Sequence, residues 1–147
     1  MSDDAIIVFL VDDHQPIVDG LMTLVEQDTR IRVVGHCNDG LEVMDRVQVA
    51  KPDVLVLDIS LPGVNGLELC RLVKKALPAT AVLMLTMHAS EQCILGALRN
   101  GALGYVTKDS AALEFRAAVY AVSRGAVYLG RGVPRTLLTE SKMGRGP

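Results

Sequence analysis

The sequence predicts a single α/β domain in which helices cover a parallel β-sheet. Apolar segments of strand length alternate with stretches of helical periodicity, which is the rhythm of βαβ units. Half of the 147 residues are hydrophobic but only 3% are aromatic, and this composition suits buried parallel strands better than an aromatic-rich sandwich. A chain of this length buries enough surface to fold without a disulfide or a structural metal.

Five apolar segments are the expected strands, at residues 5–11, 31–37, 53–57, 81–85 and 103–107. Between them, apolar residues recur at helical spacing, so that one face of each helix can cover the sheet. Pro16 shortly after Asp13 marks one helix start, and Asn65 with Glu68 three residues later resembles a capping box. A fifth helix should begin near Asp109 or Ser110 and end at about residue 124.

The end of the chain predicts a linker. The 23 residues 125–147 contain five Gly and two Pro and lose the helical periodicity. Residues 111–147 carry six basic and two acidic side chains, a balance of +4 that leaves −6 for the first 110 residues. We therefore expect a domain at 1–125 and a basic linker at 126–147.

Several classes of protein are disfavoured. Cys37, Cys70 and Cys93 are odd in number and widely spaced, with no CxxC pair, so they indicate buried, reduced thiols and no disulfide framework or zinc site. The chain has no 18-residue apolar run, and its start, MSDDAII, lacks the basic region of a signal peptide. We expect a cytoplasmic protein that has no membrane partner.

Polar residues gather where the expected strands end. Asp12 and Asp13 follow the first strand, Asp58 the third, Thr86 the fourth and Lys108 the fifth. In an open parallel sheet the ligand site lies beyond the carboxyl ends of the strands, so we expect these side chains to converge. Three neighbouring carboxylates repel one another unless a cation lies among them, and such oxygen ligands suit Mg²⁺.

Four stretches give the chain a family resemblance: VDDH at 11–14, LDISLPGVNGLEL at 57–69, LMLTMH at 83–88 and GALGYVTKD at 101–109. In these motifs and their order the chain resembles receiver domains of two-component response regulators, in particular the NarL/FixJ (LuxR-type) subfamily. The resemblance covers about residues 5–125. It implies a (βα)5 doubly wound, flavodoxin-like fold with strand order 2-1-3-4-5.

The resemblance also implies a role for each motif residue. Asp58 matches the phosphorylated aspartate, and Thr86 and Tyr105 match the switch pair. Lys108 matches the lysine that pairs with the phosphoryl oxygens. The residues implied as Mg²⁺ ligands are Asp12, Asp13, Asp58 and the backbone carbonyl of Ser60.

His14 fits the DDH form of this subfamily. It is a candidate metal ligand beside two acids, but a cap or solvent-facing role is the stronger expectation. Tyr105 is expected to repack from solvent towards Thr86 on activation.

The implied function is a signalling switch and not an enzyme in the ordinary sense. A sensor histidine kinase would transfer a phosphoryl group to Asp58, and the switch would act on transcription. A homodimer through the first and fifth or the fourth and fifth helices is a further expected partner. DNA would be bound only through a helix-turn-helix output domain that is absent from this sequence.

Other functions are also compatible with the sequence. One is a stand-alone or degenerate receiver that acts by protein–protein interaction. Another is a phosphatase with an aspartyl nucleophile, although that class needs a second acid two residues after Asp58, where this chain has Ser60. A flavodoxin-like ligand binder is disfavoured because no Ser-, Thr- and Gly-rich loop follows the first strand.

Overall fold

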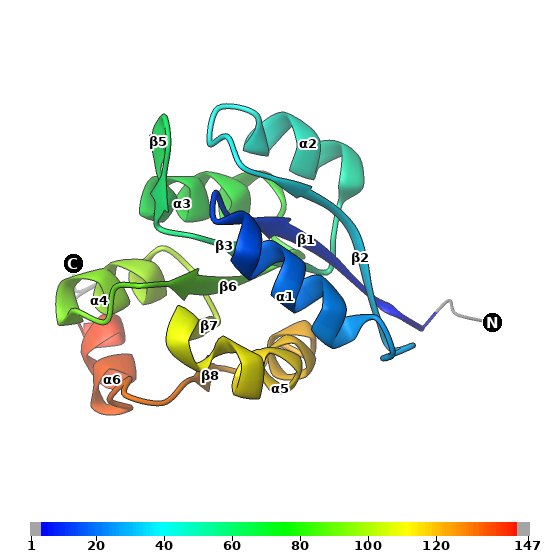
Figure 1. Ribbon diagram of the computed structural model, residues 1–147. Helices are drawn as coiled ribbons and strands as arrows, with labels where there is room; N and C mark the ends of the chain where they lie inside the picture. Colours follow the sequence, from blue (N-terminus) through cyan, green and yellow to red (C-terminus); the bar gives the residue numbers. More distant parts are fainter. Residues whose placement is uncertain (1–3, 144–147) are drawn as a thin grey trace.

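A six-stranded parallel sheet forms the centre of the molecule (Figure 1). The computed structural model describes residues 4–143. The sheet order is β2 (Ile31–Cys37), β1 (Ile6–Val11), β3 (Val54–Leu57), β6 (Ala81–Thr86), β7 (Gly104–Thr107) and β8 (Tyr128–Leu129). Its first five strands follow the expected 2-1-3-4-5 order, which confirms the predicted fold.

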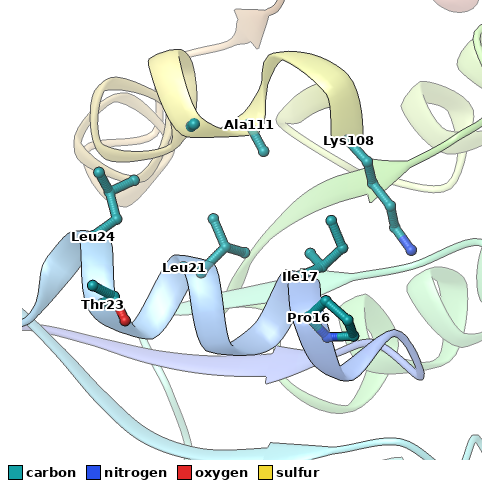
Figure 2. A pocket seen from close by; sticks show the side chains of 9 residues that line it. Pro16, Ile17, Leu21, Thr23, Leu24, Lys108 and Ala111 are labelled. Atoms are coloured by element: carbon teal, nitrogen blue, oxygen red, sulfur yellow. The ribbon is translucent and has the colours of Figure 1, made fainter.

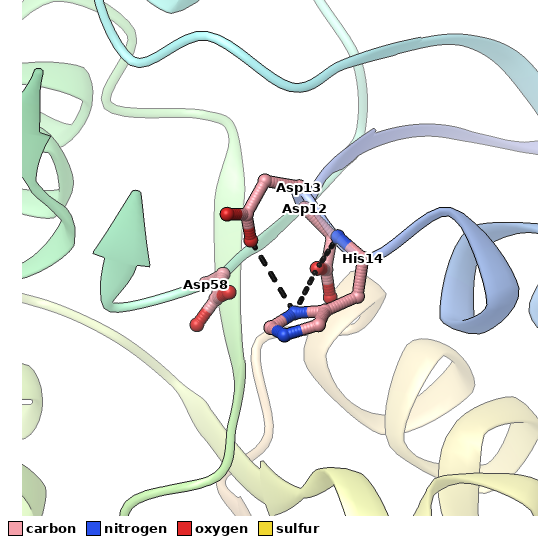
Figure 3. A group of neighbouring side chains, drawn as sticks. All are labelled: Asp12, Asp13, His14 and Asp58. Atoms are coloured by element: carbon pink, nitrogen blue, oxygen red, sulfur yellow. Dashed lines mark hydrogen bonds and ion pairs between the residues drawn. The ribbon is translucent and has the colours of Figure 1, made fainter. Parts of the chain in front are cut away.

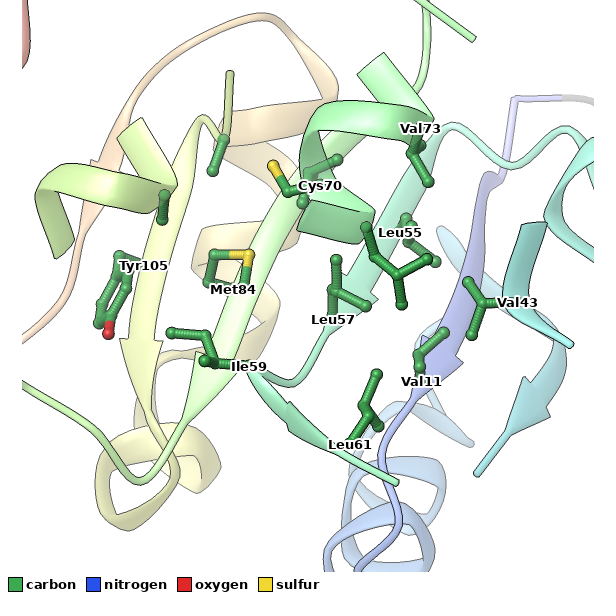
Figure 4. Packing of buried hydrophobic residues seen from close by; sticks show 14 of the residues in the cluster. Val11, Val43, Leu55, Leu57, Ile59, Leu61, Cys70, Val73, Met84 and Tyr105 are labelled. Atoms are coloured by element: carbon green, nitrogen blue, oxygen red, sulfur yellow. The ribbon is translucent and has the colours of Figure 1, made fainter. Parts of the chain in front are cut away.

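Helices cover both faces of this sheet because inward-pointing side chains alternate along each strand. On one face, α1 (Gln15–Val25) and α5 (Ala111–Ser123) pack on Val8, Leu10 and other alternate strand residues. On the other face lie α2 (Val43–Ala50), α3 (Gly66–Ala76) and α4 (Glu91–Arg99), with a cluster that includes Leu55, Leu57 and Met84 (Figure 4). The two apolar layers make the sheet a rigid support for its polar edge.

The structure confirms some of the predicted helix starts and not others. Asn65 caps α3, because its side chain accepts a hydrogen bond from the Leu67 amide at 2.7 Å. The rest of the capping box is not formed, since the Glu68 carboxylate pairs with Arg71 one turn further on. The fifth helix spans Ala111–Ser123, after a short 3-10 turn at Lys108–Ser110, close to the predicted bounds.

The tail is where the structure departs most from the sequence expectation. Residues 126–143 do not form an irregular linker: β8 adds a strand to the edge of the sheet beside β7, and α6 (Thr136–Met143) packs against α4. Val133 and Leu137 are buried in the same apolar cluster as the α4 residues. Residues 144–147 of the expected linker lie outside the described part of the chain.

Within residues 4–143, no helix has both the length and the apolar character needed to cross a membrane. The three cysteines are free thiols; Cys37 and Cys70 are buried and Cys93 is partly buried.

Candidate functional site at the carboxyl edge of the sheet

Backbone hydrogen bonds fix the positions of Asp12 and Asp58. The Asp12 amide donates to the carbonyl of Cys37 at 3.1 Å, and the Asp58 amide donates to the carbonyl of Val11 at 3.0 Å. Both bonds continue the pairing of β1 with its two neighbours one residue past the strand ends. The two carboxylates therefore emerge side by side at the carboxyl edge, as predicted from their sequence positions.

Asp58 lies at the bottom of this site and is only 1% exposed. Its Oδ2 accepts a hydrogen bond from Lys108 Nζ at 2.9 Å, and its Oδ1 accepts one from the Ser60 amide at 3.1 Å. Burial raises the pKa of Asp58 above its ordinary value, and the negative charge of Asp12 adds to this, while the bonds from Lys108 and Ser60 oppose it. The carboxylate is thus more basic than an exposed aspartate.

Lys108 brings a buried positive charge to the acids. It begins the short turn after β7, and its Nζ lies 3.0 Å from each oxygen of Asp12 as well as 2.9 Å from Asp58. The lysine side chain is 2% exposed. Because little water reaches these three groups, the attraction of Lys108 for Asp12 and Asp58 is screened less than that of a surface salt bridge.

The acids and His14 form a cluster that suits a divalent cation (Figure 3). One ligand atom each from Asp12, Asp13, His14 and Asp58 can be chosen so that all lie within 4.8 Å of one another. Among the described residues, Asp12 Oδ2 is the buried side-chain oxygen that accepts no hydrogen bond, although the Lys108 ammonium lies 3.0 Å from it as an ion-pair partner. Three carboxylates and one ammonium leave a charge of about −2. The excess negative charge and a carboxylate oxygen that accepts no hydrogen bond both fit Mg²⁺.

A close backbone approach forms the wall beside Asp58. Residues 60–65 fold back as the two-stranded hairpin of β4 (Ser60–Leu61) and β5 (Val64–Asn65), and the Gly66 amide then donates to the carbonyl of Ile59 at 2.8 Å. A Cβ on Gly66 would lie 2.2 Å from the carbonyl oxygen of Asp58. Only glycine fits there, so this residue lets α3 start directly against the strand end that carries Asp58.

His88 connects three of the predicted site residues. Its amide donates to Oγ1 of the fully buried Thr86 at 3.1 Å, and its carbonyl accepts from the Tyr105 hydroxyl at 2.5 Å. Its ring Nε2 lies 2.8 Å from Ser60 Oγ, two residues after Asp58. His88 was not among the predicted site residues, and its bond to Ser60 joins two loops that lie 28 residues apart in the sequence.

Tyr105 differs from its expected starting position. The residue is 0% exposed, and burial raises the pKa of its hydroxyl well above the ordinary value. The expectation that the ring starts in solvent is therefore wrong for this structure, where it already lies in the core. Its backbone carbonyl accepts from the Gly130 amide at 2.9 Å, so the segment that includes β8 helps to hold it there.

His14 is the residue whose surroundings the sequence predicted least well. It occupies the N-cap position of α1, but its side chain makes no capping hydrogen bond. Its ring is half-exposed and turns its Nδ1 towards the acids. The neighbouring DD pair was the one available signal for this orientation, and it could not decide between the roles that were weighed.

An apolar hollow of about 310 Å³ lies next to Lys108, between α1 and α5 (Figure 2). Its walls come from Ile17, Leu21 and Leu24 of α1 and from Ala111 and Ala112 of α5. The hollow opens on the surface that the first and fifth helices share. It carries no titratable group apart from Lys108 and therefore offers packing surface without acid–base chemistry.

Comparisons with known proteins agree with this geometry. Residues 8–120 match the response regulator receiver domain family. The DNA-binding transcriptional activator DevR/DosR of Mycobacterium tuberculosis is 41% identical over 133 residues, which cover 90% of this chain and 61% of that protein. The oxygen regulatory protein NreC of Staphylococcus carnosus is 32% identical over 90% of this chain and 62% of its own. The chain spans about three fifths of the length of these curated relatives.

Solved structures with the same fold include a LuxR-family two-component response regulator from Aurantimonas sp. SI85-9A1. It superposes with a TM-score of 0.83 at 30% identity, over 95% of this chain and 99% of that one. The isolated receiver domain of RcsB from Salmonella enterica serovar Typhimurium, studied with the phosphomimetic BeF3−, gives 0.82 at 26% identity, over 91% and 99% of the two chains.

Proposed function

Because the chain belongs to the family of response regulator receiver domains, we propose that it accepts a phosphoryl group on Asp58 from a sensor histidine kinase. The observation that carries this proposal is the buried carboxylate of Asp58, held 2.9 Å from the Lys108 ammonium beside two further acids. A carboxylate of raised pKa, with a cation fixed next to it, has the properties of a phosphoryl acceptor.

In the proposed reaction, a carboxylate oxygen of Asp58 attacks the phosphorus of a phosphohistidine. An O–P bond forms as the N–P bond breaks, and the electron pair of that bond returns to the histidine nitrogen of the kinase. Water later attacks the same phosphorus, which releases phosphate and regenerates the carboxylate. Lys108 contributes by positioning Asp58 and by neutralising charge on the phosphoryl oxygens.

The residues proposed to hold Mg²⁺ are Asp12, Asp13, Asp58 and the backbone carbonyl of Ser60. The excess negative charge supports this assignment, as does Oδ2 of Asp12, which accepts no hydrogen bond. A bound Mg²⁺ would supply charge neutralisation for the phosphoryl oxygens. Lys108 itself pairs with Asp12 and Asp58.

Thr86 and Tyr105 are the proposed switch residues, and movement of Lys108 would contribute to the switch. A phosphoryl group adds about −1.5 to −2 charge and three acceptor oxygens. One hydrogen bond to such a group contributes about 1.5–3 kcal/mol, whereas a shift from 1:99 to 99:1 needs about 5.5 kcal/mol. Thr86 alone is therefore too weak for a full switch, and Lys108 with the His88–Tyr105 contact would have to add the rest.

The proposed output is control of transcription through a helix-turn-helix domain. The relative DevR/DosR is named a DNA-binding transcriptional activator, which supports a role in transcription. For a homodimer, the structure favours the first and fifth helices. The hollow between α1 and α5 leaves apolar surface open, whereas α6 packs on α4 and covers part of the alternative surface.

Phosphorylation can be tested directly by incubating the chain with acetyl phosphate and Mg²⁺ and mapping the added mass to a residue. We expect one acid-labile phosphoryl group on Asp58, none on Asp58→Asn, and an undiminished level on the matched control Asp45→Asn, whose exposed side chain lies on α2. Phosphate retained by Asp58→Asn would contradict the assignment. Release of inorganic phosphate from exogenous phosphomonoesters would favour the phosphatase alternative.

A further inference from the structure

The tail, residues 126–143, pairs with the strand that carries Tyr105. Strand β8 lies parallel to β7, where the Tyr128 amide donates to the Leu103 carbonyl and the Gly130 amide donates to the Tyr105 carbonyl, both at 2.9 Å. These bonds fix the backbone of Tyr105 from the side opposite β6. The tail therefore acts directly on one of the two proposed switch residues.

Glu114, in the first turn of α5, latches this part of the tail. Its carboxylate accepts a hydrogen bond from the Tyr128 hydroxyl at 2.9 Å, and it shares the Arg131 amide between Oε1 at 3.1 Å and Oε2 at 3.2 Å. Gly130 lies between these two partners, and a Cβ there would come within 2.8 Å of Glu114 Oε1. One carboxylate thus holds the chain on both sides of the residue that pairs with Tyr105.

The other end of the tail adds an apolar anchor. Helix α6 lies beside α4 (Figure 1). Val133 and Leu137 are 6% and 2% exposed, in the same apolar cluster as Ile94 of α4 and Tyr105. Both side chains would meet water if the tail came away, so their burial favours the docked arrangement. The tail is therefore attached by one polar and one apolar contact, and both favour the buried position of Tyr105.

A continuous set of hydrogen bonds leads from Tyr105 to Thr86. The Tyr105 hydroxyl donates to the carbonyl of His88, and the amide of His88 donates to Thr86 Oγ1 at 3.1 Å. A hydroxyl whose oxygen accepts from an amide keeps its own hydrogen to donate elsewhere. The buried Tyr105 thus helps to orient Thr86 as a donor, which is what the phosphoryl oxygens of the proposed function need.

We propose that the tail, latched by Glu114, holds Tyr105 in the core before phosphorylation and so keeps Thr86 ready to bind the phosphoryl group. This inference rests on the proposed function of Asp58 and assigns the tail a part in it. Coupling between two sites is reciprocal. A phosphoryl group on Asp58 therefore stabilises the docked tail by the same factor by which the docked tail stabilises the phosphorylated state.

The test measures the affinity of the purified chain for the phosphomimetic BeF3− in the presence of Mg²⁺. Tyr128→Phe removes the hydroxyl that donates to Glu114 and keeps the ring. We expect it to weaken BeF3− binding about fivefold or more and to leave Mg²⁺ affinity unchanged. Tyr120→Phe is the matched control, because its hydroxyl donates to Asp28 in the turn between α1 and β2. It should change BeF3− affinity less than about twofold.

A second variant and two further readouts address the tail itself. Leu137→Ala weakens the apolar anchor and should lower BeF3− affinity in the same direction. Bound BeF3− should slow hydrogen exchange of the Tyr128 and Gly130 amides, as reciprocity requires. Without any ligand, a soluble paramagnetic probe should broaden the Tyr105 ring signals more in the two tail variants than in wild type or Tyr120→Phe.

The outcomes separate this inference from the proposed function. Unchanged BeF3− affinity in both tail variants, or an equal loss in Tyr120→Phe, would overturn the coupling. An equally protected Tyr105 ring in all four proteins would show that the tail does not hold this residue. A wild-type chain that binds Mg²⁺ but neither binds BeF3− nor accepts a phosphoryl group would overturn the proposed function and the coupling with it, while the ring signals would still decide whether the tail holds Tyr105.

Discussion

Asp58 and Asp28 are both buried aspartates, yet their surroundings shift their pKa values in opposite directions. Asp58 is 1% exposed at the carboxyl edge of the sheet, and Asp28 is 9% exposed in the turn between α1 and β2. Burial raises the pKa of Asp58. At Asp28, the hydrogen bond from the Tyr120 hydroxyl lowers the pKa, with further help from Arg30, and together they exceed the effect of burial.

The difference lies in what each carboxylate faces. Asp28 accepts hydrogen bonds from Tyr120 and from the amide and guanidinium of Arg30, and Arg116 lies 3.9 Å away. Within residues 4–143, the one cation that pairs with Asp58 is Lys108, and Asp58 shares it with Asp12. A carboxylate that serves structure is thus fully satisfied by its neighbours, whereas the one at the candidate site leaves room for a further cation.

The largest expected effect comes from removing the cation at each site. Lys108→Met should lower the free energy of unfolding by about 3–5 kcal/mol in metal-free buffer, because it leaves two buried carboxylates unpaired. Arg30→Met should lower it by about 1 kcal/mol or less, since the Arg30 side chain is 71% exposed. Urea unfolding of the two variants measures both values. Equal losses would mean that the two aspartates are held in the same way.

Metal binding should stabilise the folded protein through the site around Asp58 and not through Asp28. Mg²⁺ at about 100 times its dissociation constant should raise the free energy of unfolding by about 2.7 kcal/mol, because only the folded state assembles the ligands. The increase should vanish in Asp13→Asn and persist in Asp28→Asn. Thermal unfolding with and without EDTA provides the measurement. Stabilisation that survives in Asp13→Asn would place the cation elsewhere.

Neutralising each aspartate should change stability with opposite sign. In metal-free buffer at neutral pH, Asp58→Asn should raise the free energy of unfolding by about 1 kcal/mol, since it removes a charge that burial disfavours. Asp28→Asn should lower it by about 1 kcal/mol, because the charged hydrogen bonds weaken. Denaturant titration of both variants tests the signs, and a loss of stability in Asp58→Asn would refute this account of its raised pKa.

The smallest effects concern pH. The folded state binds a proton on Asp58 more tightly than the unfolded state does. The contribution of Asp58 to the free energy of unfolding should therefore increase as the pH falls through its raised pKa towards the ordinary value of 3.8. The pH dependence of Asp28 has the opposite sign. Asp28 stabilises the protein above pH 3.8, and this stabilisation is lost as the pH falls through its lowered pKa. The difference in free energy of unfolding between wild type and Asp58→Asn should therefore become smaller as the pH is lowered from 7 to 4. The difference between wild type and Asp28→Asn should stay constant over the same range.

Much of the fold was predictable because its signals are local. Residues 31–37 were predicted as a strand and form β2 with the same bounds, and the other four predicted strands match within one residue at each end. Continuous apolar runs between helical stretches leave few alternatives to a parallel sheet. The hairpin of residues 60–65 and strand β8 have strands of two residues, too short for any periodicity to appear.

The sequence by itself determined the α/β class, the strand order through the family resemblance, and the convergence of Asp12, Asp58 and Lys108 at one edge. These follow from strand periodicity and from the rule that parallel strands end on the same side of a sheet. Their placement needed no knowledge of side-chain contacts.

Only the tertiary structure decided which distant groups meet. The Tyr120 hydroxyl reaches Asp28 across 92 residues of sequence, Leu137 becomes buried because α4 offers it an apolar surface, and the His14 ring turns inward because Lys108 lies beside it. No local pattern encodes such contacts, since each depends on the free energy of bringing together groups from separate elements. The pKa shifts and the donor set around Asp58 are therefore properties of the folded chain.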